Sequence, residues 1–402
     1  MTEGGRGQPR RGSGRSGARR SVASDLRGAT RLVVEATQGV SGIVEDMQGP
    51  TLGIAGLVHW SVRAVTRLVG GGLDAALAPF VHLLGETRTR PELEALLAAL
   101  NGVLGDHLAA TGNPLAIPME LRRDGVALDL ERRALARALP RATGKVLVLV
   151  HGSCMDDLRW RRNGHEHGEA LERDLGYTTV RLRYNSGLHV STNGKELAAI
   201  LERLVRAWPV PVKELSILAH SMGGLVSRSA CHEAVAKGLQ WPRKLRAMVF
   251  LGTPHHGAPA ERAGNLVNVV LAAAPFTGPL ARLPRIRSAG VTDLRHGNVL
   301  DSDWEGRDRF RHGPDPRTPV PLPRGVRCFA IAASTARGPD APARGDTLVT
   351  VDSALGRHPD PAFDLRFPAA RRWVAWGTDH LGLLDRPEVY ERIRGWMGAR
   401  LK

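Results

Sequence analysis

A series of short apolar runs, separated by segments with helical patterns, constrains the fold of this 402-residue chain most strongly. The runs are Lys145–His151, Thr178–Tyr184, Leu215–His220, Ala247–Leu251, Val326–Ala332 and Arg372–Gly377. Helical patterns such as Gly194–Ala207 and Met222–Ala236 lie between them. Strands that alternate with helices favour a parallel sheet, because each crossover helix packs on one face of it. The sequence therefore predicts an α/β fold, in which helices cover both faces of a mostly parallel sheet.

The residues before this pattern differ from it in composition. Residues 1–27 are mainly Gly, Ser and Arg, which bury too little surface to offset the entropy of ordering, so we predict a disordered Arg/Gly-rich tail. Residues 28–112 have helical patterns and form a predicted helical N-terminal region. In the clearest pattern, after Pro91, one helical face carries Leu93, Leu96, Leu97, Leu100, Leu104 and Leu108. The Gly-rich apolar segment Leu52–Leu84 either packs on the rest of the chain, which we favour, or lies on a lipid surface.

A single large domain is predicted over residues 113–402. It opens with Met119–Leu130, whose alternation around Asp124-Gly125 predicts a β-hairpin, since this dipeptide tolerates positive φ. Residues 258–325 form a long insertion that is rich in Pro and Arg. Insertions over a rigid scaffold often carry specificity, so we predict a cap-like insertion there. The alternative is an irregular excursion without such a role.

The net charge of +16 is the composition feature that first suggests a polyanionic partner. Only six of the 56 basic residues are Lys, and no recognition motif accompanies the charge, so we predict no specific nucleic-acid partner. The three cysteines are far apart, without metal-ligand or redox spacing, and no apolar signal segment follows the Arg-rich start. This pattern favours free thiols, no metal or cofactor, and a cytoplasmic location.

The most specific motif places Ser221 between the apolar run Leu215–His220 and a helical pattern. A serine at a sharp strand-to-helix turn presents its hydroxyl, but such a turn needs small residues two positions before and after it. Ala219 and Gly223 meet this need, although Ala stands where the usual pattern has Gly. The motif predicts Ser221 as a nucleophile, and a helix N-cap serine is the structural alternative.

A nucleophilic serine also needs hydrogen-bond donors for the oxyanion that develops in the transition state. The run Val146–Val150 ends in His151-Gly152-Ser153, where one such donor is expected. We therefore predict that the backbone N–H groups of Ser153 and Met222 form the oxyanion hole, and that His151 shapes the loop.

The general base has to be selected from fifteen histidines. In this arrangement the acid follows the serine, and the histidine comes last, after the final strand. His380 follows the strand-like Trp373–Gly377 and precedes the C-terminal helix, so we predict it as the base. His358 lies in a Pro-rich loop, and we interpret His255 and His256, which follow another predicted strand, as turn or pocket-lining residues.

The acid that orients this histidine should lie on the loop after the penultimate strand, Val326–Ala332. Asp346 fits this place, and its carboxylate would fix the imidazole tautomer and stabilise the imidazolium. Asp352 and Asp340 are its neighbours and remain the alternatives.

These segments resemble bacterial lipases and esterases of the α/β-hydrolase superfamily. The resemblance spans residues 113–402, and nothing before residue 113 takes part in it. It rests on these motifs: His151-Gly152, Ala219-His-Ser-Met-Gly-Gly224, Gly252-Thr-Pro-His-His-Gly257, Gly345-Asp346 with Val349 and Ser353-Ala354, and His380-Leu381. The second and third are similar to motifs of triacylglycerol lipases and of deacylases that act on lipid-linked esters. The resemblance implies an α/β-hydrolase fold and hydrolysis of carboxylic esters through an acyl-enzyme.

The predicted partner is therefore an ester substrate, whether or not it is lipid-like. Weak association of the N-terminal region with a membrane or lipid surface is compatible with this prediction. Two alternatives remain open: an acyltransferase with the same triad, and a non-catalytic protein that binds lipid or a granule. The presence of Ser221, Asp346 and His380 together argues against the non-catalytic alternative, since a decayed site is free to lose any member.

Overall fold

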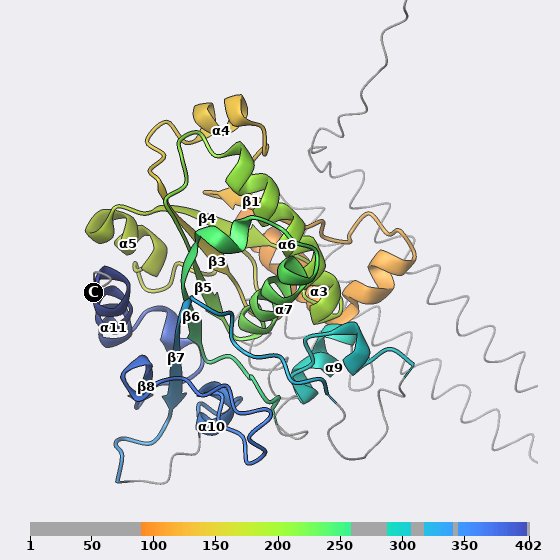
Figure 1. The fold of residues 1–402 in the computed structure, drawn as a ribbon. Coiled ribbons are helices and arrows are strands. Elements are labelled where there is room, and N and C mark those ends of the chain that lie inside the picture. The colour runs from red at the N-terminus through yellow and green to blue at the C-terminus, as the bar shows by residue number, and fades with distance from the viewer. Residues whose placement is uncertain (1–89, 259–287, 307–316, 341–344, 400–402) are drawn as a thin grey trace, which may run out of the picture.

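The computed structural model describes residues 90–258, 288–306, 317–340 and 345–399 (Figure 1). Its strands are β1 Glu120–Arg123, β2 Val126–Ala127, β3 Lys145–Val150, β4 Thr178–Arg183, β5 Glu214–His220, β6 Leu245–Leu251, β7 Arg327–Ser334 and β8 Arg372–Trp376. Its α-helices are α3 Arg90–Ala110, α4 Arg132–Ala138, α5 His167–Leu175, α6 Val190–Ala207, α7 Met222–Ala236, α9 Ala289–His296, α10 Val351–Ala354 and α11 Pro387–Gly398. Short 3-10 turns are η1 Trp241–Lys244, η3 Asp301–Asp303, η4 Ala369–Arg371 and η5 Gly382–Leu384.

The strands form one sheet in the order β2-β1-β4-β3-β5-β6-β7-β8. β1 is antiparallel to β2 and β4, and every other neighbouring pair is parallel. The predicted mostly parallel sheet is thus confirmed. The predicted hairpin is confirmed as well, because Asp124 and Gly125 join β1 to β2 with φ of 50° and 73°.

Two apolar clusters, one on each face, cover the sheet. On one face, α4, α6, α7 and α10 pack on alternate strand residues such as Val148 and Ile217. On the other face, α3, α5 and α11 pack on the intervening residues, such as Leu149 and Leu218 (Figure 1). The sheet is therefore enclosed by helices on both sides, as the continuous apolar runs predict.

Helix α3 confirms the leucine pattern read from the sequence. It has Pro91 in its first turn, where a missing N–H costs nothing. Its leucines 96, 97, 100 and 108 are almost completely buried against the sheet. The predicted tail, the segment Leu52–Leu84 and most of the predicted insertion lie outside the described residues.

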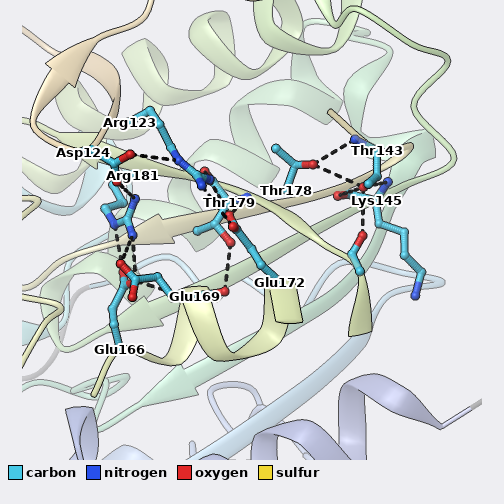
Figure 2. A network of polar contacts seen from close by, with 12 residues as sticks. Arg123, Asp124, Thr143, Lys145, Glu166, Glu169, Glu172, Thr178, Thr179 and Arg181 are labelled. Carbon is cyan, nitrogen blue, oxygen red and sulfur yellow. Dashed lines mark hydrogen bonds and ion pairs between the residues drawn. The ribbon is translucent and has the colours of Figure 1, made fainter. Parts of the chain in front are cut away.

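Buried arginines on β1 and β4 are a feature that the sequence did not indicate. Arg181 donates from Nε and Nη2 to the two carboxylate oxygens of Glu166, at 2.8 and 2.6 Å, and both side chains are buried (Figure 2). Arg183 of the same strand donates to Glu94 of α3 at 2.8 Å, and Arg122 of β1 lies 3.3 Å from the same carboxylate. These ion pairs fasten α3 and the start of α5 to the antiparallel edge of the sheet.

Glu166→Ala should destabilise the fold by up to roughly 3 kcal/mol, because the buried Arg181 guanidinium keeps only the more distant carboxylates of Asp124 and Glu169, each 3.6 Å away. The free energy of unfolding in denaturant measures this. The double variant Glu166→Leu/Arg181→Met should recover much of the loss, since it removes both charges. Glu391→Gln, which breaks a solvent-exposed pair with Arg394, is the control and should leave the unfolding midpoint near wild type. A Glu166→Ala midpoint equal to that of this control would contradict the prediction.

Candidate active site

Ser221 occupies a sharp turn between β5 and α7. Its backbone has φ 53° and ψ −126°, a region that costs a residue with a Cβ on the order of 1–3 kcal/mol. Its N–H donates to Leu251 O at the end of β6, at 2.8 Å. The turn therefore fixes Ser221 at the carboxyl edge of the parallel strands.

Close packing explains the small residues around this turn. A Cβ on Gly223 would lie 2.6 Å from His151 O, and one on Gly224 would lie 2.6 Å from Thr253 Cγ2. Gly152 approaches the turn from the loop after β3, and a Cβ there would lie 3.0 Å from Ser221 Cβ. Any side chain at these positions would displace the first turn of α7 or the facing loop.

Asp346 and His380 are brought together although they are 34 residues apart in the chain. His380 Nδ1 lies 2.6 Å from Asp346 Oδ2, and both side chains are almost completely buried. The other carboxylate oxygen, Oδ1, accepts from the N–H groups of Leu348 and Val349, at 3.0 and 2.8 Å. The loop thus holds one oxygen of Asp346 and leaves the other for the imidazole.

His220 supports the backbone of His380. Its Nε2 donates to His380 O at 3.1 Å, and the two ring centroids are 4.7 Å apart. Burial, and the neighbouring His380 after it, hold the pKa of His220 well below its usual value, so the ring is neutral at pH 7. The sequence pattern does not indicate this role of His220, although the residue lies inside the serine motif.

Ser221 Oγ and His380 Nε2 form no hydrogen bond to any described residue, and both atoms are buried. Both residues contact the Leu251-Gly252 turn. Leu251 O accepts from Ser221 N, and a Cβ on Gly252 would lie 3.0 Å from His380 Nδ1. Catalytic hydrogen bonds are often long in unliganded sites and shorten when substrate binds.

The predicted oxyanion donors lie beside this turn. Met222 N begins α7, and Ser153 follows Gly152, which packs on Ser221. His151 stacks on Tyr184 with centroids 4.4 Å apart, and Tyr184 Oη donates to His151 O at 2.9 Å. Burial lowers the pKa of His151 to about 4, so its ring is neutral at pH 7 and packs as part of the loop.

The protein family described as "PGAP1-like alpha/beta domain" matches residues 141–316. This chain has the α/β-hydrolase fold. Among solved structures, the mature form of a Bacillus licheniformis lipase is 19% identical, over 63% of this chain and 91% of that one, with a TM-score of 0.39. A Pyrococcus furiosus esterase is 14% identical, over 64% of this chain and 83% of that one, with a TM-score of 0.38. No curated protein matches the sequence.

The residues weighed as alternative acids and bases lie elsewhere in the structure. Asp352 is exposed and pairs with Arg357 at 3.2 Å, and Asp340 is exposed. His358 is partly exposed, and its ring is tilted by 55° to that of Phe363, with centroids 5.2 Å apart. His255 and His256 line a small cavity beside α7. Within the described ranges, none of these side chains forms a hydrogen bond to Ser221, Asp346 or His380.

Helix α3, which lies before the residues that carry the family resemblance, packs directly on the loop of the predicted oxyanion donor Ser153. A Cβ on Gly102 would lie 2.9 Å from Cys154 Cα and would overlap its Sγ. Cys154 follows Ser153 and has a φ of 58°, which is unusual for a residue with a side chain. Its N–H donates to Ser186 Oγ at 2.9 Å. The loop is thus held from two sides in a strained conformation.

The described residues contain no cluster of three or more His, Cys, Asp or Glu side chains that could hold a metal ion. Among these same residues, none of the helices is both long and apolar enough to cross a bilayer.

Gly102→Ala should slow covalent labelling of Ser221 by a fluorophosphonate, by up to about a hundredfold, because a displacement near 1 Å in a supporting loop can cost that much. The measurement is the labelling rate constant, at a temperature where the variant is shown to be folded. Gly395→Ala on α11 is the control, since a Cβ there meets nothing within 4 Å. Equal labelling rates for the two variants would contradict a supporting role for α3.

Proposed function

We propose that this protein hydrolyses carboxylic esters through an acyl-enzyme on Ser221, with His380 as general base and Asp346 as the acid that orients it. The observation that carries this proposal is the buried pair of Asp346 Oδ2 and His380 Nδ1, 2.6 Å apart, at the same sheet edge as the strained turn of Ser221. The order serine, acid, histidine along the chain is the order that this fold uses.

The first half of the reaction forms the acyl-enzyme. Ser221 Oγ attacks the ester carbonyl carbon, and its proton passes to His380 Nε2. The Asp346 carboxylate accepts a hydrogen bond from His380 Nδ1–H. This hydrogen bond selects the tautomer with a basic Nε2 and stabilises the imidazolium. The N–H groups of Ser153 and Met222 donate to the oxyanion. When the intermediate collapses, His380 returns the proton to the departing alcohol.

The second half releases the acid. Water attacks the acyl-enzyme, His380 accepts the water proton, and collapse of the second tetrahedral intermediate restores Ser221 and liberates the carboxylic acid. An acceptor alcohol in place of water would make the protein an acyltransferase, and product analysis with an added alcohol separates the two reactions. The choice of an ester rests on the resemblance of Ala219–Gly224 and Gly252–Gly257 to lipase motifs.

The proposal also assigns residues 113–402 to the catalytic domain. Helix α3 packs on this domain through the apolar cluster of its leucines and the ion pair of Glu94 with Arg183. A catalytic fragment should therefore begin before Arg90, so that this helix is retained. We further propose a cytoplasmic location and weak attraction of the N-terminal region to lipid surfaces.

Ser221→Ala should abolish turnover of a soluble p-nitrophenyl ester, with a loss of about a millionfold, the scale for removal of a nucleophile that acts together with its base. His380→Ala should match this loss. Circular dichroism of Ser221→Ala should equal that of wild type, because this change opens no large cavity. His380→Ala removes a buried imidazole, so it is assayed at a temperature where its circular dichroism shows that it is folded. Retention of more than a few per cent of activity by a folded Ser221→Ala would show that another residue is the nucleophile.

Asp346→Asn should preserve the shape of the loop but favour the wrong imidazole tautomer, and should lower turnover by up to about ten-thousandfold. Asp352→Asn is the matched control, because Asp352 is exposed and pairs with Arg357. Both variants are assayed on the same soluble ester. If Asp352→Asn were inactive and Asp346→Asn near wild type, Asp352 and not Asp346 would be the acid.

A further inference from the structure

A small polar cavity lies behind α7, apart from the residues proposed for catalysis. Its volume is about 10 Å³, close to the space that one water molecule needs. Its wall includes Arg228 of α7, His255 and His256 of the loop after β6, and Asp303 and Arg317 from two further segments. The Gly252–Gly257 motif therefore supplies two histidines to this cavity.

Arg228 carries a buried charge without an acidic partner. Its side chain makes no ion pair within 4 Å with any residue of the described ranges. Nη2 donates to Val320 O at 2.6 Å, whereas Nε is buried without a hydrogen-bond partner there. Burial, followed by the nearby Arg317 charge, lowers the pKa of Arg228 to about 10, so it remains charged at pH 7.

His255 adds a further donor. Arg228 Nη1 lies 3.5 Å from His255 Nδ1, and a guanidinium can only donate, so the neutral ring of His255 carries its proton on Nε2. That Nε2 is buried and makes no hydrogen bond to a described residue. His256 lies beside it on the same cavity wall, with the Gly356 backbone within reach of its ring.

The nearby charge of Asp303 offsets part of the Arg228 charge, but its carboxylate forms no ion pair with the guanidinium. Its Oδ1 accepts from Thr318 N at 2.8 Å, and its Oδ2 accepts from Val299 N and Leu300 N at 2.9 and 3.0 Å. The carboxylate thus holds the 299–303 turn to the segment that begins at Arg317. Within the described residues, Arg228 Nε–H and His255 Nε2–H therefore have no acceptor in the cavity wall.

We propose that this cavity binds one monatomic anion of the size of chloride, held by Arg228 Nε–H and His255 Nε2–H. The volume is too small for phosphate, sulfate or a carboxylate. A water molecule would satisfy the two donors but would add no negative charge beside Arg228, which forms no ion pair in the described ranges, and buried charges need a counter-charge. The anion would join α7, the loop after β6 and the 299–303 turn, and so would stabilise the fold without taking part in ester cleavage.

The direct test uses the wild-type protein and depends on no variant. Crystals grown in sodium bromide are measured at the bromine absorption edge. An anomalous peak in the cavity, in contact with Arg228 and His255, is the expected result. Density for an ordered water without an anomalous peak would overturn the proposal.

The second test measures thermal unfolding in sodium chloride and in sodium gluconate at equal ionic strength. A bound anion stabilises only the folded state, so chloride should raise the midpoint by a few degrees over gluconate. Arg228→Met, similar in size but uncharged, should lose this difference. Arg203→Met on α6 is the matched control, because Arg203 is exposed, and it should keep the difference. Equal wild-type midpoints in the two salts would also refute the site.

Discussion

The single residue on which the structure depends most is Ser221, with its positive φ between β5 and α7. A chain that turns from strand to helix within one residue places the first turn of the helix against the neighbouring loops. Gly152, Gly223 and Gly224 lie at those contacts because a Cβ would overlap backbone or side-chain atoms. The strain at Ser221 is offset by the hydrogen bond of its N–H to β6 and by the ladders on both sides of β5. The position of every other site residue is then set relative to this turn.

Parallel strands bring the site residues together because their carboxyl ends meet at one edge. The first residues after β6 and β8 are also hydrogen-bonded to the neighbouring strand β7. Gly252 N donates to Ile331 O of β7 at 2.8 Å, and Thr378 N donates to Ser334 O at 3.0 Å. Asp346 and His380 are thus carried by loops whose bases are fixed to adjacent strands. A pair of catalytic groups requires precise placement, and a rigid scaffold supplies it.

The sequence was sufficient for the features that depend on local pattern. Apolar runs predicted the strands of the parallel sheet, and small residues around Ser221 predicted the sharp turn. Chain order alone selected Asp346 and His380, which the structure places in contact, although their catalytic roles stay predictions. The features it did not indicate depend on packing between distant segments. An apolar helical face shows that α3 is buried, but not that Gly102 meets Cys154.

Buried arginines were missed for a related reason. Arg is mostly exposed in proteins, so the sequence alone does not indicate that Arg181 and Arg228 are buried. Burial of an arginine can be inferred only when its partner is known, and the partner of Arg181 is Glu166. Arg228 has no such carboxylate in the described part of the chain, which is why it pointed to an anion.

Helix α3 changes how the N-terminal region relates to the site. The loop of the predicted oxyanion donor Ser153 has a strained Cys154, and strain of this kind persists only where the surroundings hold it. Gly102 of α3 packs on Cys154, and Ser288, the N-cap residue of α9, donates from Oγ to Gly102 O at 2.7 Å, so α9 supports the same point. The Asn101 side chain donates from Nδ2 to Leu115 O and accepts at Oδ1 from Ile117 N. These two hydrogen bonds fix the helix to the chain that leads into β1. Residues outside the family resemblance thus support a loop inside it, and a change in α3 should reach Ser153 through packing alone.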